Sequence, residues 1–152
     1  MGCSLSSVIC DIDALIEYQS KILNYKCDAL DEIMSSNKNS IIITDRTFID
    51  FIAYTTVWMK QHSQYTLATA FLDSYKNTCE KLQHQYEIDV VYFPINVFSH
   101  IDDGIRAGSD TQADIDNIIL GVLSDLNRKY FTVSANSPEE RVTQILDYIR
   151  MD

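Results

Sequence analysis

A run of β-branched residues that ends in an acid and a base decides the fold; it reads Ser40-Ile41-Ile42-Ile43-Thr44-Asp45-Arg46. Consecutive β-branched residues without polar alternation are typical of a strand that is buried on both faces of a parallel sheet. The next residues predict a helix, whose apolar positions are Phe48, Ile49, Phe51, Ile52 and Tyr54. The stretch therefore predicts a strand over 40–44, a helix directly after it and an α/β fold.

The rest of the chain continues this alternation of helices and short strands. Apolar periodicity and capping signals predict helices over residues 8–34 and 64–86, further helices that open at Ser109 and at Ser137-Pro138, and strands over 88–93 and 130–133. This order predicts a three-layer α/β fold, in which helices cover both faces of a parallel sheet. The length suits a single domain over 1–152, with an irregular start over 1–9 and a lid-like loop over 94–109.

The charge balance is strongly acidic, with 12 Lys and Arg against 22 Asp and Glu and a net charge of −10. Nonspecific contact with nucleic-acid phosphates requires a basic surface, and so does binding to an anionic membrane. We therefore expect no nucleic-acid partner and no membrane partner. A nucleotide is still a candidate ligand, provided that a few cations gather locally to hold its phosphates.

The cysteines and histidines show no metal-binding pattern. Cys3, Cys10, Cys27 and Cys79 form no C-x-x-C pair, and no histidine stands at ligand spacing from them. We therefore expect no structural metal. Cys27 and Cys79 fall in apolar helical stripes, which predicts free thiols in the core, and reduced thiols are typical of a cytoplasmic protein.

Charged residues follow two of the predicted strands, at the sheet edge where ligands bind in parallel α/β folds. Asp45 can hold a Mg²⁺-bound water or accept a proton, and Arg46 can grip a phosphate with two hydrogen bonds. The alternative is that Asp45 caps the following helix and Arg46 pairs with a surface acid. The loop with Asp103 and Arg106 is either a mobile loop that carries an arginine onto phosphates or a plain surface turn.

Gln19 is a polar residue in the middle of the apolar face of the helix predicted over 8–34. An amide at this position can hydrogen-bond the edge of a base or sugar from within an apolar pocket. The alternative is that the backbone satisfies it.

Three segments, taken in order, carry a family resemblance. Residues 41–54 resemble a strand with a D-R-S motif, residues 103–106 a D-G-x-R lid motif, and residues 137–141 an S-x-E-E-R helix start. These motifs are those of small P-loop kinases, the nicotinamide-riboside kinase-like and nucleoside or nucleotide kinase-like proteins often described as AAA-type ATPase domains. The resemblance implies ATP and Mg²⁺ as cofactors. It implies that Asp45 is the metal or base carboxylate and that Arg46 is a phosphate ligand.

The same resemblance implies roles for two further arginines. Arg106 would be a lid arginine over the transferred phosphoryl group, and Arg141 would lie on the nucleotide side of the last helix. With Asp103 and Gln19, they complete the expected nucleotide or nucleoside site.

The family's phosphate loop, G-x-x-x-x-G-K-[ST], has no counterpart in these 152 residues, and neither has the strand that precedes it in the family. The amides and the lysine of that loop supply most of the positioning and charge that phosphoryl transfer needs. We therefore expect a degenerate kinase-like domain that binds a nucleotide or a protein partner without efficient phosphoryl transfer. Two alternatives stay open. One is an ATP-dependent nucleoside or nucleotide kinase that is truncated or completed by another chain; the other is a non-enzymatic, homo-oligomeric interaction protein.

Overall fold

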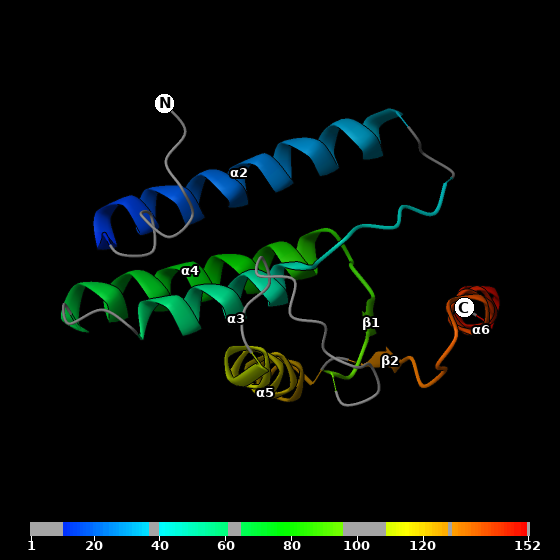
Figure 1. The fold of residues 1–152 in the computed structure, drawn as a ribbon. Helices are drawn as coiled ribbons and strands as arrows, with labels where there is room; N and C mark the ends of the chain where they lie inside the picture. The colour runs from blue at the N-terminus through cyan, green and yellow to red at the C-terminus, as the bar shows by residue number, and fades with distance from the viewer. Residues whose placement is uncertain (1–10, 37–39, 61–64, 96–108, 128, 152) are drawn as a thin grey trace, which may run out of the picture. The chain divides into compact units, whose positions relative to one another are not determined.

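The structure is a computed structural model that describes residues 11–36, 40–60, 65–95, 109–127 and 129–151 (Figure 1). These residues are mostly helical. The elements are α2 (Ile12–Ser36), α3 (Phe48–Met59), α4 (Tyr65–Gln85), β1 (Val90–Tyr92), α5 (Ser109–Asp125), β2 (Tyr130–Thr132) and α6 (Pro138–Met151). They divide into two compact units, residues 1–86 and residues 87–152.

The first unit is built from α2, α3 and α4, and α3 packs against both of the other helices (Figure 1). All three helices contribute to one hydrophobic cluster, because each turns an apolar stripe inward. The cluster contains the buried residues Ile12, Leu15, Met59 and Ala68, with Ile16, Trp58 and Phe71 packed against it. The helices predicted from the apolar period at 8–34 and 64–86 are confirmed as α2 and α4 where the structure describes them; residues 8–10 and 64 lie outside the described residues.

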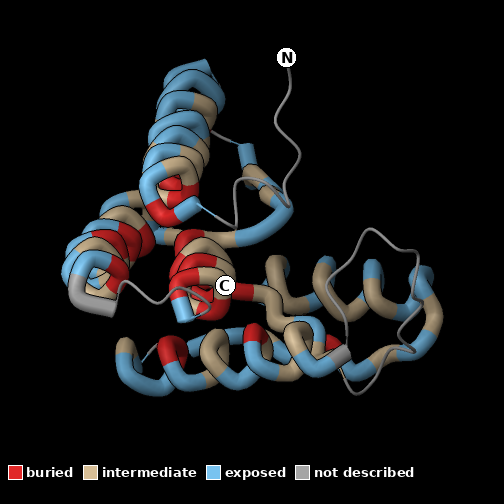
Figure 2. Tube along the Cα trace, turned by 60° about the vertical axis from the view of Figure 1, so that its left-hand side comes forward, coloured by how far each residue is buried: buried red, intermediate tan, exposed pale blue. Residues whose placement is uncertain are grey.

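Helix α3 is the most buried element of this unit, with seven of its 12 residues buried (Figure 2). Thr47 caps its first turn by accepting a hydrogen bond from the Ile49 amide at 3.2 Å. The Asp50 carboxylate completes a capping box, since it accepts the Thr47 amide at 2.6 Å and the Thr47 hydroxyl at 2.9 Å. The helix therefore begins at Phe48 with its first amides satisfied.

The strand predicted over residues 40–44 is wrong. Residues 41–44 carry no strand assignment in the structure, and the side chains of Ile41 and Ile43 are 69% and 77% exposed. A strand exists only where a neighbour completes its hydrogen-bond ladder, and the sole ladder among the described residues joins β1 to β2. The predicted three-layer fold, in which helices cover both faces of a parallel sheet, is accordingly not found among the described residues. Their sheet has two strands.

The second unit contains this sheet and helices α5 and α6. Strands β1 and β2 are parallel, with Val90 opposite Tyr130 and Tyr92 opposite Thr132. The Val133 amide continues the pairing by donating to the Tyr92 carbonyl at 2.9 Å. The Tyr92 hydroxyl donates to Asp116 of α5 at 2.8 Å, which ties that helix to the sheet. Both strands lie inside the ranges predicted from the sequence.

Helix α6 begins as the sequence predicts. Pro138 is its first residue, and the Ser137 hydroxyl accepts the Glu140 amide at 3.2 Å. The side chain of Tyr148 stacks on Phe131 of β2, with ring centroids 4.8 Å apart.

Two further expectations can be compared with the structure. Cys27 and Cys79 are free thiols, half-buried and buried respectively. In the described part of the chain, no helix combines the length and the apolar character that crossing a membrane requires.

Candidate functional site

The Asp45-Arg46 turn is held from outside by a lysine of α2. Lys26 Nζ donates to the carbonyl oxygen of Asp45 at 3.3 Å and to that of Arg46 at 3.1 Å. The Thr44 hydroxyl also donates to the Arg46 carbonyl, at 3.1 Å. The backbone of Arg46 lies in the left-handed region, with φ of 62°. A residue with a Cβ enters this region at a cost, and the three hydrogen bonds to the turn offset part of that cost.

The side chain of Arg46 rests on an aromatic ring. Its guanidinium carbon lies 4.4 Å from the centroid of the Tyr54 ring, within the range of a cation–π contact. Arg46 is nevertheless exposed. A cation–π contact at an exposed site is worth only about 0.5–1 kcal/mol, so a phosphate can compete for this guanidinium.

Asp45 does not cap the following helix. That role belongs to Thr47 and Asp50, so this alternative for Asp45 is wrong. The carboxylate of Asp45 is left exposed at the turn. It can therefore meet a ligand or a hydrated cation without breaking a helix cap.

The charges around the turn nearly balance. Partial burial lowers the pKa of Lys26, while the carboxylates of Asp45 and Asp50 oppose this effect by favouring its charged form. A bare phosphate would thus meet two carboxylates as well as Lys26 and Arg46. A phosphate that carries a divalent cation matches this mixture of charges better, because the cation can face the carboxylate and the phosphate can face the arginine.

The donors at the turn fit Mg²⁺ only as part of a nucleotide complex. Among the residues that the structure describes, no group of three or more His, Cys, Asp or Glu side chains could hold a metal ion. Mg²⁺ commonly takes one or two carboxylates and completes its shell with phosphates and water. Asp45 could supply such a single carboxylate.

Gln19 is buried in α2, with 2% of its surface exposed. Its side-chain nitrogen has no hydrogen-bond partner, and its backbone carbonyl accepts the Tyr75 hydroxyl at 3.3 Å. Burial of an amide nitrogen without a hydrogen-bond acceptor is costly, so this nitrogen is a candidate donor to a polar group. Lys26 follows seven residues later on the same face of the helix, about 10 Å along its axis.

Arg141 lies in the second unit and orders the loop after β2. Its Nε donates to the Ala135 carbonyl at 3.1 Å and its Nη2 to the Asn136 carbonyl at 2.6 Å. Ala135, Glu140, Thr143 and Gln144 line a surface pocket beside it. Arg141 is half-buried, and these two hydrogen bonds direct its guanidinium to backbone carbonyl oxygens.

The structure brings Asp45 and Arg46 together with Lys26 in one unit, and Gln19 lies on the same helix as Lys26. Arg141 belongs to the other unit, whereas Asp103 and Arg106 lie outside the described residues. Sequence reasoning missed Lys26, although its spacing of seven from Gln19 placed it on the same helix face. It counted Tyr54 as an apolar position and missed its contact with Arg46.

The chain matches a known protein family. A family model described as an AAA domain matches residues 5–141 of the chain. Comparisons with curated proteins and with solved structures returned no match.

Proposed function

Since this chain belongs to the AAA-domain family, we propose that its Asp45-Arg46 turn binds the phosphates of a Mg²⁺–nucleotide complex without efficient phosphoryl transfer. Membership confirms the resemblance drawn from the three motifs and indicates a nucleotide-binding, P-loop-like function. Domains of this kind typically use ATP and Mg²⁺. The preformed turn, with its left-handed arginine held by Lys26, is the observation that carries the proposal.

Arg46 is the phosphate ligand in this proposal. Its guanidinium leaves the Tyr54 ring and forms two parallel hydrogen bonds with phosphate oxygens, which is the geometry that arginine favours. Asp45 would hold the Mg²⁺, which would neutralise part of the phosphate charge. Gln19 offers its unused amide donors to the base or sugar. For Asp103, Arg106 and Arg141, a role as nucleotide ligands rests on the family resemblance alone.

Two facts support weak phosphoryl transfer by this chain alone. The 152 residues contain no G-x-x-x-x-G-K-[ST] motif, and the cations described at the turn are Lys26 and Arg46. Lys26 already donates to two carbonyl oxygens. Phosphoryl transfer depends on aligned amides and cations around the migrating group, so binding can persist where catalysis is weak.

Isothermal titration calorimetry with ATP, other nucleotides and nucleosides, each with and without Mg²⁺, tests binding. Arg46→Ala should weaken ATP–Mg²⁺ binding about tenfold or more, because a charge-assisted contact to phosphate contributes at least ~1.4 kcal/mol. Arg150→Ala is the matched control, since Arg150 is an exposed arginine that pairs with Asp147 of its own helix. Absence of binding by the native chain, or equal affinities in both variants, would refute the proposal.

A second assay separates the degenerate domain from a working kinase. The purified chain is incubated with ATP, Mg²⁺ and a panel of nucleosides and nucleotides, and the phosphorylated products are separated by chromatography. We expect binding without turnover. Efficient product formation by these 152 residues would establish the kinase and overturn the degenerate assignment.

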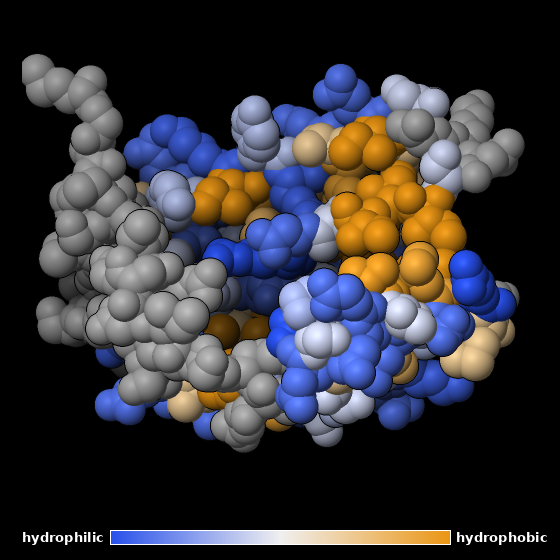
Figure 3. All heavy atoms as spheres, turned by 45° about the vertical axis from the view of Figure 1, so that its right-hand side comes forward, coloured by the Kyte–Doolittle hydropathy of each residue, from blue (hydrophilic) through white to orange (hydrophobic). Residues whose placement is uncertain are grey.

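The alternative of an oligomeric interaction protein rests on a different observation. Ile41 and Ile43 are large, exposed apolar side chains on a segment that has no ladder partner among the described residues. Figure 3 shows that hydrophobic residues reach the surface between hydrophilic ones. Sedimentation over a hundredfold concentration range tests this function. A monomer throughout would exclude a homo-oligomer.

A further inference from the structure

Lys26 donates its hydrogen bonds to the backbone of a segment that is distant in the sequence. It lies 19 and 20 residues before the two carbonyls that it contacts, and its Nζ is within 3.3 Å of both oxygens. A lysine at a helix surface normally extends into water, because its charge is strongly hydrated. Here the side chain is half-buried and directed at one turn.

The turn requires such support. Arg46 has φ of 62°, and the structure records the same left-handed region at only two other described residues with a Cβ, Glu87 and Asn127. Glu87 and Asn127 follow the ends of α4 and α5, where helices commonly terminate in this way. Arg46 precedes a helix instead, so helix termination does not explain its conformation. A residue keeps such an unfavourable backbone conformation only where several surrounding contacts hold it there.

Besides the hydrogen bond from Thr44, contacts from both neighbouring helices favour this conformation. The bonds from Lys26 orient both carbonyls of the turn, and the guanidinium of the left-handed Arg46 lies on the Tyr54 ring of α3. Tyr54 lies two turns into α3, a helix whose start Thr47 and Asp50 fix. In the free protein, Lys26 of α2 therefore holds the backbone of Arg46, and Tyr54 of α3 holds its side chain until a phosphate displaces the weak ring contact.

We propose that Lys26 is a positioning residue, which holds Arg46 in the left-handed conformation and so aims its guanidinium at the ligand phosphate. The proposal rests on the proposed function, which it deepens by naming a residue that the family motifs do not contain. Lys26 acts through the backbone of the turn. It does not need to touch the nucleotide.

The first test reads the turn in the free protein by NMR. The three-bond coupling between the Arg46 amide and α protons, with its ¹³Cα shift, reports the backbone angle φ. Upfield shifts of the Arg46 δ protons report stacking on Tyr54. In Lys26→Met, which keeps the length of the side chain and removes its donors, these signals should move away from their native values. Lys26→Arg, which can donate to two carbonyls, should restore them.

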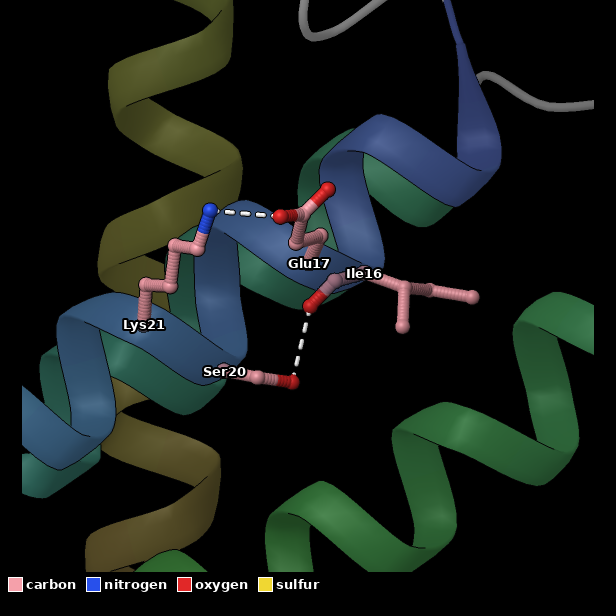
Figure 4. Close-up of polar contacts among 4 residues, drawn as sticks. All are labelled: Ile16, Glu17, Ser20 and Lys21. Atoms are coloured by element: carbon pink, nitrogen blue, oxygen red, sulfur yellow. Dashed lines mark hydrogen bonds and ion pairs between the residues drawn. The ribbon is translucent and has the colours of Figure 1, made fainter.

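Lys21→Met is the matched control. Lys21 lies on the same helix five residues earlier and pairs with Glu17, while Ser20 bonds the Ile16 carbonyl (Figure 4). Neither contact reaches the turn. The Arg46 signals should be unchanged in this variant.

The second test measures ATP–Mg²⁺ affinity in the same four proteins. If the left-handed turn falls to about a tenth of the population in Lys26→Met, the apparent dissociation constant rises about tenfold, because only that fraction binds. Lys26→Arg should bind within about twofold of the native chain, and Lys21→Met likewise.

The outcomes separate the two claims. Native Arg46 signals in Lys26→Met would overturn the positioning role. Altered signals with unchanged affinity would overturn its link to the ligand and leave nucleotide binding standing. If the native chain binds no nucleotide, the proposed function and that link both fall, and the NMR result still decides whether Lys26 holds the turn.

Discussion

Replacing Ile43 by alanine separates the observed structure from the fold that the sequence predicts. In a buried central strand, this isoleucine would be packed on all sides, and its truncation would leave a cavity. In the structure it is 77% exposed, on a segment that pairs with no strand in the part of the chain that is described.

The expected cost follows from this exposure. Full burial of an isoleucine contributes about 1.5–3 kcal/mol, and roughly a quarter of the Ile43 side chain is removed from water. Ile43→Ala should therefore lower the free energy of unfolding by only about 0.5 kcal/mol. Ile52→Ala is the matched control, because Ile52 is 2% exposed within α3. Truncation of such a residue costs about 2–5 kcal/mol.

Urea denaturation, followed by circular dichroism and by the fluorescence of Trp58, measures both variants. Each is run at two protein concentrations tenfold apart, because a contact between copies would make the effect depend on concentration. A loss of 2 kcal/mol or more for Ile43→Ala, at both concentrations, would show that Ile43 is buried within the chain. The exposed segment described above would then be wrong.

Three further predictions concern stability. Burial raises the pKa of the Cys79 thiol from 9.0 to about 12, so the folded state keeps a proton that the unfolded chain releases, and stability falls as pH rises through this range. In Cys79→Ala, the free energy of unfolding measured in urea should fall less steeply between pH 9 and 11, by about 1.4 kcal/mol per pH unit. An unchanged slope would contradict the raised pKa of Cys79. Glu87→Gly should raise the free energy of unfolding by about 1 kcal/mol, and with it the urea midpoint, because glycine adopts φ of 50° without strain. A lower midpoint would argue against that backbone conformation. Thr47→Ala should cost about 1 kcal/mol, because it removes the acceptor for the Ile49 amide, whereas Thr47→Ser should retain most of the stability.

The helices could be predicted because the apolar period is a local signal that tertiary packing reinforces. Helices α2 and α4 show this, since Leu15 and Ala68 fall on the predicted inner faces and enter one core cluster. Residues 40–44 show the limit. Their β-branched composition is a preference for extended backbone, and only a paired neighbour turns that preference into a strand. Composition cannot reveal whether that neighbour is present.

The site was predictable in its residues and not in its geometry. The charge pair Asp45-Arg46 was visible, and so was the polar interruption at Gln19, which proved to be buried. The left-handed turn at Arg46 could not be predicted from the local sequence, because it depends on Lys26, which lies 20 positions earlier in α2. The helix cap could have been found, since Thr47 and Asp50 have the spacing of a capping box.

Helix α6 is attached to its unit by a few side chains and by no buried residue. None of the residues of α6 is buried, and Val142 and Leu146 are 56% and 42% exposed. The contacts that attach it include those of Arg141 and Gln144 with the loop after β2 and the stacking of Tyr148 on Phe131. Such an element can open as a separate cooperative unit at a fraction of the free energy of global unfolding. Its amide hydrogens therefore exchange with solvent through an opening that leaves β1 and β2 paired, well before those of the buried helix α3.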